Sequence, residues 1–454
     1  MIVYYKDIKG VFYMCGRRKV LELFCEQKET MEERINQGIE NYRKGFMRIS
    51  VKDKDGNPVS DAKIRVNQKS HEFKFGANIF MLDELETEEK NEAYKKYFAD
   101  IFNIATLPFY WNDLEPQQGK TRYHKDSPKI YRRPNIDLCM EFCEKHNIEP
   151  REHALAYEHH FPAWLKDATV EEIKLLLEKR YKEISDLYKD KIPTIEVTNE
   201  LNLWKEGQTA INDEPDFIEW AFKLAEKYFP QNELTINEYA DPCWENIANV
   251  SNPYYAYIEN NLLKGARIDA IGMQYHLFFS KEDEYNRTRP YYDPKNLYKH
   301  MDLFARFNKP LQVTEVTIPA YSNETEDEEL QADIIELLYS IWFSHPNMEQ
   351  IIYWNLVDGY AAFAPQGDMT AGENYYYGGL LRFDLTPKPA YLRLKKLIGK
   401  VWHTEEETIT NENGLADIKG FFGEYDVTVL VGGEEVKKTV NLSKNDSNEF
   451  EIEI

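Results

Sequence analysis

The central part of the chain repeats one pattern, a short apolar run followed by a longer segment with helical periodicity. Eight apolar runs occur, at 75–80, 102–109, 149–156, 194–200, 233–239, 270–276, 311–318 and 350–357. The segments between them place apolar residues every three to four positions, which is typical of amphipathic helices. Eight strand–helix units are what a (β/α)8 barrel requires, and no glycine-rich phosphate loop supports a doubly wound sheet instead. We therefore predict an α/β fold, with a (β/α)8 TIM barrel over residues 75–402.

The segments on either side of this region have a different pattern. Residues 46–74 and 403–454 alternate apolar and polar side chains around turn signals such as DGNP, Asn-Gly and Gly-Gly. This pattern is typical of β-hairpins, and a lone hairpin is only marginally stable in water. We predict that the N- and C-terminal strand segments pack together as one small accessory β-sandwich. Its modest aromatic content favours a structural role over sugar binding.

Residues 1–45 are predicted to form an N-terminal extension and a helix. The stretch from Met31 is typical of a polar helix that leads into a strand. Residues 1 to about 30 look unlike the rest of the chain, and we expect a poorly ordered extension or the product of a misassigned start codon. The first residues lack the order of a secretory signal, so the expected location is cytoplasmic.

Charge and composition narrow the choice of partners. The net charge of −23 disfavours nucleic acid and membrane surfaces, and no apolar run approaches the length of a membrane span. Five cysteines without regular spacing argue against a disulfide framework. The 31 Tyr and 8 Trp suit a cleft in which aromatic rings stack on sugars. We expect a polysaccharide or oligosaccharide partner and no cofactor, and the oligomeric state stays open.

Catalytic groups of (β/α)8 barrels lie at the carboxyl ends of the strands. Glu200 ends the fourth apolar run and Glu315 lies in the seventh, so the two carboxylates face each other across the barrel mouth. Glycoside hydrolysis needs such a pair, since one group protonates the leaving oxygen and the other attacks the anomeric carbon or directs water. Asn237, near the end of the fifth run, either supports the Glu200 region or has a structural role, and Trp111 is assigned to packing.

Several motifs resemble glycoside hydrolase family 10, in the family's order and over residues 75 to about 400. They are TIEVTNE at 194–200, VTEVTI at 313–318, QYH at 274–276 and REHALAYEHHFPAW at 151–164. The resemblance implies that Glu200 acts as general acid and then base, and that Glu315 is the nucleophile of a double displacement with retention. It further implies that Asn199 bonds the sugar 2-hydroxyl.

The same resemblance assigns the remaining side chains of the site. His276 would hold Glu315 ionised and correctly aimed, with Gln274 beside it. His153 would bind the reacting sugar, and Trp354 would form the hydrophobic wall of its subsite. The implied substrate is a β-1,4-linked glycan, namely xylan or xylo-oligosaccharide.

The chain departs from the family pattern around the neighbouring subsite. Aligned on Trp111, the polar residues of the family are replaced by Thr106, Leu107 and Tyr110. Tyr157, Glu158 and His160 are further replacements, and Asn355 stands where glycine is usual. We therefore count Tyr110, Tyr157 and Glu158 among the candidate substrate-binding residues. A decorated or different β-glycan remains an alternative substrate.

Two other classes of protein stay open. His153, His159, His160 and His276 raise the possibility of a metal-dependent barrel hydrolase, but the first strand lacks the usual His-x-His, and we expect no metal. A non-catalytic sugar-binding barrel is the second alternative, against which the presence of both carboxylates speaks.

Overall fold

The computed structural model describes the chain except for residues 1–4, 7–11, 14–15, 201–208 and 246. Eight parallel strands form a closed barrel in the order β10-β11-β12-β5-β6-β7-β8-β9, which confirms the predicted fold class. Their bounds are β5 (Lys74–Asn78), β6 (Ile104–Pro108), β7 (Glu149–His153), β8 (Thr194–Asn199), β9 (Glu233–Glu238), β10 (Ala270–His276), β11 (Leu311–Thr317) and β12 (Met348–Tyr353).

One principal helix follows each strand and covers the outside of the barrel. These helices are α3 (Glu88–Ala99), α5 (Ile136–His146), α6 (Val170–Tyr188), α7 (Phe217–Tyr228), α8 (Pro253–Leu263), α10 (Pro294–Phe304), α11 (Thr325–Ser344) and α12 (Pro389–Lys396). Their starts follow local chemistry. Thr169 and Glu172 form a reciprocal capping box at the start of α6, and Pro253 and Pro294 occupy the first turns of α8 and α10.

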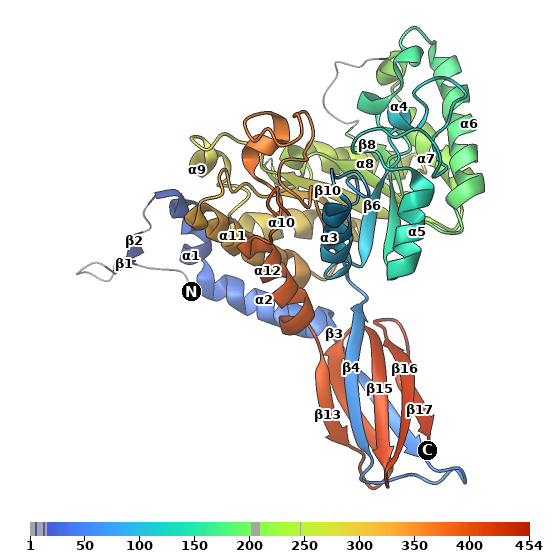
Figure 1. The fold of residues 1–454 in the computed structure, drawn as a ribbon, viewed down its shortest axis with the longest axis vertical. Helices are drawn as coiled ribbons and strands as arrows, with labels where there is room; N and C mark the ends of the chain where they lie inside the picture. Colours follow the sequence, from blue (N-terminus) through green and yellow to red (C-terminus); the bar gives the residue numbers. More distant parts are fainter. Residues whose placement is uncertain (1–4, 7–11, 14–15, 201–208, 246) are drawn as a thin grey trace.

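The strand segments outside the barrel form two sheets packed face to face. One sheet has the order β13-β4-β15-β16 and the other β14-β3-β17. The bounds are β3 (Lys44–Lys52), β4 (Lys63–His71), β13 (Glu405–Ile409), β14 (Leu415–Phe421), β15 (Gly423–Val431), β16 (Glu434–Leu442) and β17 (Glu449–Glu453). Alternate side chains of both sheets, among them Ile49, Val66 and Val427, are buried in a separate core. The accessory β-sandwich built from both ends of the chain is thus present (Figure 1).

The expectation of poor order up to residue 30 is wrong from Gly16 onward. A 3-10 helix (Gly16–Leu21) and α1 (Glu22–Glu26) precede the long α2 (Lys28–Tyr42), which runs beside the barrel toward the sandwich (Figure 1). Leu21 is fully buried in the main core. Arg17 forms a bidentate pair with Glu284 at 2.7 and 2.8 Å. This part of the chain is therefore an integral part of the barrel's packing.

Before Gly16, the structure describes two short strands. Tyr5–Lys6 (β1) pairs antiparallel with Phe12–Tyr13 (β2). The rest of the expected extension lies outside the described residues. Across the part of the chain that is described, no helix combines the length and apolar character that a membrane crossing needs.

Candidate active site

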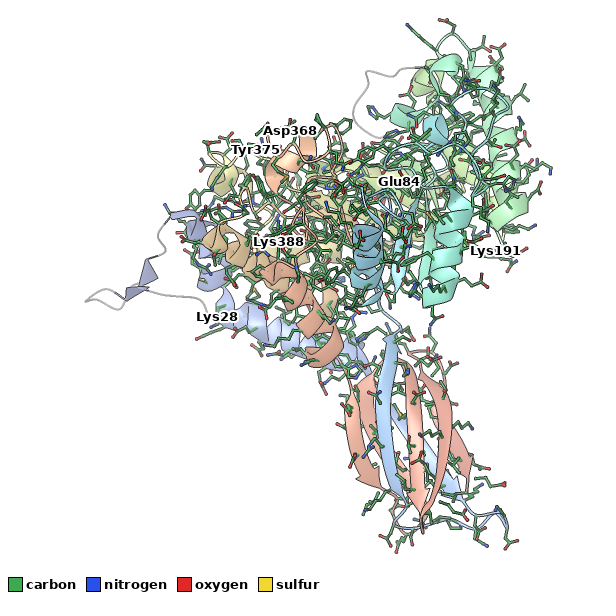
Figure 2. All side chains as sticks on the ribbon, in the orientation of Figure 1. Lys28, Glu84, Lys191, Asp368, Tyr375 and Lys388 are labelled. Atoms are coloured by element: carbon green, nitrogen blue, oxygen red, sulfur yellow. The ribbon has the colours of Figure 1, made fainter. Side chains whose placement is uncertain are left out.

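A cavity of about 530 Å³ opens at the carboxyl ends of the barrel strands. Both predicted catalytic glutamates line it, together with His153, Asn199, His276 and Trp354. The loop after β12 forms part of its wall, and Asp368 and Tyr375 of that loop lie at the end of the barrel away from the sandwich (Figure 2). The structure therefore gathers most of the predicted site residues around one cavity.

Glu200 follows directly after β8, and its backbone has the left-handed φ of 53°. The peptide N–H of Glu200 donates to the carbonyl of Asn237 on the neighbouring strand. Two side chains donate to its carboxylate, the hydroxyl of Tyr157 at 2.6 Å and the amide of Gln274 at 2.7 Å. The carboxylate is thus aimed by donors from β10 and from the loop after β7.

Glu315 lies within β11 and is held by a different pair of donors. Asn237 Nδ2 donates to Oε1 at 3.1 Å, and His276 Nε2 lies 3.0 Å from Oε2. The hydroxyl of Thr314 donates to Asn237 Oδ1 at 2.7 Å, which fixes the amide so that its nitrogen faces the carboxylates. Asn237 therefore positions Glu315, which decides between the two roles that the sequence left open for it.

The protonation of this site differs from the expectation for a nucleophile. Burial raises the pKa of Glu315 to about 8, and the charges of Glu200 and Glu196 act in the same direction. Burial also lowers the pKa of His276 to about 4, so this imidazole is neutral near pH 7. A neutral His276 supplies a hydrogen bond from Nε2 while Nδ1 accepts from Thr317, and it supplies no charge. His276 therefore aims Glu315 through a hydrogen bond, whereas its low pKa gives no support to the expectation that it also keeps Glu315 ionised.

The positive charge next to Glu315 comes from another pair of residues. His153 Nδ1 lies 2.8 Å from Glu196 Oε1, and the Arg151 guanidinium lies 2.5 Å from Glu196 Oε2. Burial opposes protonation of His153, but Glu196 outweighs it and raises the pKa of that imidazole. His153 and Arg151 both lower the pKa of Glu315, which partly offsets its burial.

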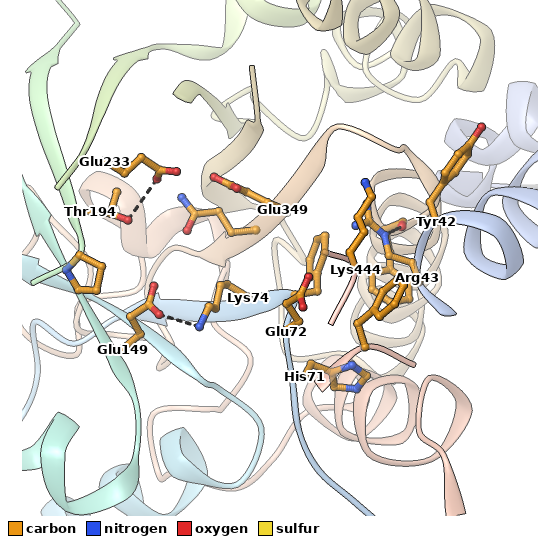
Figure 3. Close-up of a pocket in the computed structure, with 15 residues that line it drawn as sticks. Tyr42, Arg43, His71, Glu72, Lys74, Glu149, Thr194, Glu233, Glu349 and Lys444 are labelled. Atoms are coloured by element: carbon orange, nitrogen blue, oxygen red, sulfur yellow. Dashed lines mark hydrogen bonds and ion pairs between the residues drawn. The ribbon is translucent and has the colours of Figure 1, made fainter. Parts of the chain in front are cut away.

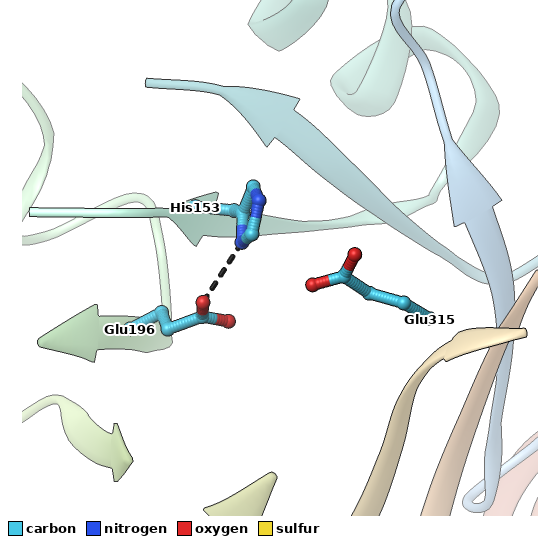
Figure 4. Close-up of side chains that lie close together, drawn as sticks. All are labelled: His153, Glu196 and Glu315. Atoms are coloured by element: carbon cyan, nitrogen blue, oxygen red, sulfur yellow. Dashed lines mark hydrogen bonds and ion pairs between the residues drawn. The ribbon is translucent and has the colours of Figure 1, made fainter. Parts of the chain in front are cut away.

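His153, Glu196 and Glu315 are also close enough together to hold a metal ion (Figure 4). Within the described residues, this group of three is the one that meets the spacing, and it differs from the set of four histidines that the sequence suggested. Arg151 already neutralises Glu196, and Asn237 donates to both glutamates. Because Arg151 and His153 already pair with the two oxygens of Glu196, the local chemistry favours a hydrogen-bonded network.

The reacting sugar would meet three further predicted side chains. Asn199 lines the cavity and accepts bonds from Asn237 and Gln274 through Oδ1, while its buried Nδ2 has no partner among the described residues. This free donor is suited to a sugar hydroxyl. The ring of Trp354 lies 5.5 Å from that of His153 and forms an apolar wall of the cavity. Tyr110 also lines the cavity, where its hydroxyl lies 3.1 Å from His153 Nε2.

Two predicted substrate-binding residues have other contacts. Glu158 is buried, and its Oε1 accepts from the backbone N–H and the hydroxyl of Thr209, so it anchors the return of the chain after Glu200. It is not among the residues that line the cavity. Gln274 is likewise buried, and its amide positions Glu200. Trp111 packs against Phe161, as the packing assignment requires.

The sequence reasoning missed Arg151 and Glu196. Both are charged residues in strands that were predicted to be buried, and each lies an even number of positions from a predicted site residue. Arg151 is two residues before His153, and Glu196 is four before Glu200. Side chains at this period share one face of a strand, so the spacing could have placed both in the barrel interior.

A second cavity, of about 280 Å³, lies at the opposite end of the barrel, between its strands and the sandwich (Figure 3). It contains Lys74 paired with Glu149 at 2.7 Å, and Gln312 donates to both Glu233 and Glu349. Burial raises the pKa of Glu349 to about 8. In (β/α)8 barrels this end serves stability, since the chemistry is located at the carboxyl ends of the strands.

Two separately held carboxylates, one directly after β8 and one within β11 of a (β/α)8 barrel, line one cavity, and this is the arrangement that a glycoside hydrolase needs. A model of glycosyl hydrolase family 10 matches residues 67–396, and the chain belongs to this family.

Known proteins are similar over different parts of the chain. Endo-1,4-beta-xylanase B of Thermotoga neapolitana is 24% identical over 68% of this chain and 84% of its own length. The anti-sigma-I factor RsgI6 of Acetivibrio thermocellus is 25% identical over 91% of this chain, and endo-1,4-beta-xylanase 1 of Arabidopsis thaliana is 22% identical over 94%. The chain spans 48% and 41% of the lengths of these last two proteins.

The solved structures agree with the fold. Xylanase 10B from Thermotoga petrophila RKU-1 in complex with xylobiose gives a TM-score of 0.58 at 22% identity, covering 73% of this chain and 95% of that one.

Proposed function

We propose that this protein is a retaining glycoside hydrolase that cleaves β-1,4-linked glycans, with xylan or xylo-oligosaccharide as its substrate. The observation that carries the proposal is the pair Glu200 and Glu315, each held by its own two donors and both lining one cavity. Membership of family 10 and the similarity to enzymes named as xylanases support the substrate class.

The two carboxyl groups divide the reaction between them. Glu315 attacks the anomeric carbon and forms a glycosyl ester, while Glu200 gives its proton to the leaving glycosidic oxygen. Glu200 then takes a proton from water, which attacks the ester, releases the sugar with retained configuration and frees Glu315. Tyr157 and Gln274 keep the Glu200 carboxyl in place through both proton transfers.

The surroundings of Glu315 favour its charged form most strongly during the reaction. Burial disfavours the free carboxylate, whereas Arg151 and His153 favour it. Positive charge develops on the sugar ring in the oxocarbenium-like transition state, directly beside Glu315. Groups that are already oriented toward this point stabilise the transition state without reorganisation, and the unpartnered Asn199 Nδ2 is placed to contribute.

A decorated or different β-glycan is the alternative substrate. It is supported by Tyr110 on the cavity wall and by Asn355, which stands where the family usually has glycine. A non-catalytic sugar-binding role would leave the four donors to the two carboxylates unexplained.

The proposal is tested by incubating the protein with xylan, xylo-oligosaccharides and a panel of aryl β-glycosides. We expect turnover in which proton NMR detects the β-anomer as the first product. Glu315→Ala should abolish turnover, and azide should restore it in Glu200→Ala with formation of a β-glycosyl azide. An α-anomer as first product, or no turnover on any β-glycan, would contradict the proposal.

A further inference from the structure

A well-anchored segment, residues 128–133, forms one side of the active-site cavity, and we name it the strap. The buried guanidinium of Arg122 holds both of its ends, because Nε donates to the carbonyl of Pro128 at 2.7 Å and Nη2 to that of Arg133 at 3.2 Å. One side chain thus clamps the two ends of the strap together. The segment is a fixed part of the cavity and not a free loop.

The strap crosses from the β6 side of the barrel to the β12 side. Arg132, which is 6% exposed, donates to the carbonyl of Tyr360 and, at 3.1 Å, to Asn355 Oδ1. Asn355 in turn donates to Glu373 at 2.9 Å, which ties the strap to the loop after β12. Because β5 lies between β6 and β12 in the barrel, the strap passes over the carboxyl end of β5. These contacts account for the unusual asparagine at position 355.

The inner side of the strap continues into the cavity wall. The guanidinium of Arg133 is paired with Asp113 at 2.6 Å and lies 4.1 Å from the centre of the Tyr110 ring. The ring of His160 lies 4.1 Å from that of Tyr110, and the Tyr110 hydroxyl reaches His153. A continuous row of contacting side chains therefore extends from the strap to the residue that would bind the reacting sugar, and these side chains line the cavity at its strap end.

The end of the cavity at the strap would face the non-reducing part of the substrate. The general acid must lie on the side of the leaving group, because it protonates the oxygen that departs. The strap covers β5, which is two strands from β11 with Glu315 and three strands from β8 with Glu200. Phe80, two residues after β5, packs against both Tyr110 and Trp354, so the strap end of the cavity directly adjoins the wall of the reacting subsite.

We infer that the strap limits the enzyme to one sugar unit on the non-reducing side of the scissile bond. The enzyme then removes single units from the non-reducing end and does not cut inside long chains. This inference rests on the proposed function and specifies how it is carried out. This specificity requires that the strap leave no room for a second sugar unit. Moving the strap aside would break the buried hydrogen bonds of Arg122 and Arg132, which is costly.

Two aryl substrates distinguish the possibilities, a β-xyloside and a β-xylobioside with the same leaving group. We expect kcat/KM for the β-xyloside to exceed that for the β-xylobioside by at least about tenfold. A faster reaction of the β-xylobioside would overturn the inference while leaving the proposed hydrolase function intact. If neither compound nor any other aryl β-glycoside of the panel reacts, the proposed function itself fails.

Variants of the strap provide a second test of the inference. Asn355→Gly removes one acceptor of Arg132 at a position whose φ of 68° suits glycine, and Arg132→Ala removes both contacts. Both should lower the preference for the β-xyloside by about tenfold, whereas Lys129→Ala, on the exposed side of the strap, should leave it unchanged. An unchanged preference in folded Asn355→Gly and Arg132→Ala would contradict the role of the strap.

Product analysis needs no variant and checks the same inference. Xylohexaose labelled at its reducing end should be shortened one unit at a time, with labelled pentaose as the first labelled product. Labelled di- or trisaccharide as an early product would show internal cleavage and overturn the inference.

Discussion

Replacing Glu315 by glutamine should stabilise the protein, and the gain should grow with pH. The folded protein raises the pKa of this carboxyl from 4.5 to about 8, mainly by burial. Between these values the folded state binds a proton that the unfolded chain has released. A state that binds more protons loses stability as pH rises, so the wild type loses free energy of unfolding from about pH 4.5 up to about pH 8.

The size of the effect follows from the same two pKa values. Linkage gives a cost of about 3 kcal/mol at pH 7 and less than about 1 kcal/mol at pH 5. Glutamine avoids this cost and keeps the contacts, because its Oε1 accepts from Asn237 and its amide can donate to His276. The neutral His276 can change tautomer, since the hydroxyl of Thr317 either donates or accepts.

Urea unfolding of wild type and Glu315→Gln at pH 5, 6, 7 and 8 measures this difference. We expect the variant to be more stable at pH 7, by a margin that shrinks toward pH 5. Glu200→Gln is the matched control, because the charge of Glu200 is only one of the causes that raise the pKa of Glu315. Glu200→Gln should therefore still lose part of its free energy of unfolding as the pH rises. Parallel stability curves for wild type and Glu315→Gln would refute the reasoning.

Three further predictions concern residues around the site and at the N-terminus. Asn237→Ala should lower kcat about 10- to 100-fold with little change in KM on an aryl glycoside, because Glu315 loses the donor that aims it. A rise in KM of that size with unchanged kcat would point to a role in substrate binding instead. Arg17→Ala should lower the free energy of unfolding in urea by about 3 kcal/mol, since it leaves Glu284 buried without its charge partner. A change below about 0.5 kcal/mol would contradict a stabilising role of this N-terminal contact. Dialysis against a chelator should leave activity and melting temperature unchanged, because Arg151 already neutralises Glu196; loss of activity that Zn²⁺ or Ca²⁺ restores would contradict this.

The barrel, and the place of two glutamates on one cavity at its carboxyl end, could be predicted because both depend on local patterns. Strand and helix periodicity determines eight units, and the carboxyl end of each strand points to the same face. Glu200 and Glu315 are placed by the strand to which they belong, and no long-range contact is needed to find them. The same holds for His153 and Asn199.

The strap along the cavity could not be predicted, because it depends on contacts between distant segments. Arg132 meets Asn355 across 223 positions, and nothing in either local sequence indicates the other. Arg17 and Glu284 are 267 positions apart, which is why the N-terminal segment looked unrelated to the rest. The contact between Glu158 and Thr209 could not be predicted either, since Thr209 lies outside the strand and helix segments that periodicity describes.

Residue type and spacing also do not reveal which groups of the site are protonated. A glutamate beside a histidine suggests an ion pair, but burial acts on both side chains and favours the neutral form of each. The charge on Glu315 therefore depends on Arg151 and His153 and on the reacting sugar itself. As positive charge develops at the anomeric carbon, the carboxylate gains an interaction that the free protein lacks, and this gain is larger in a buried site than in water. Burial that makes the free carboxylate unfavourable thus increases the stabilisation of the transition state relative to the ground state, and this lowers the free-energy barrier.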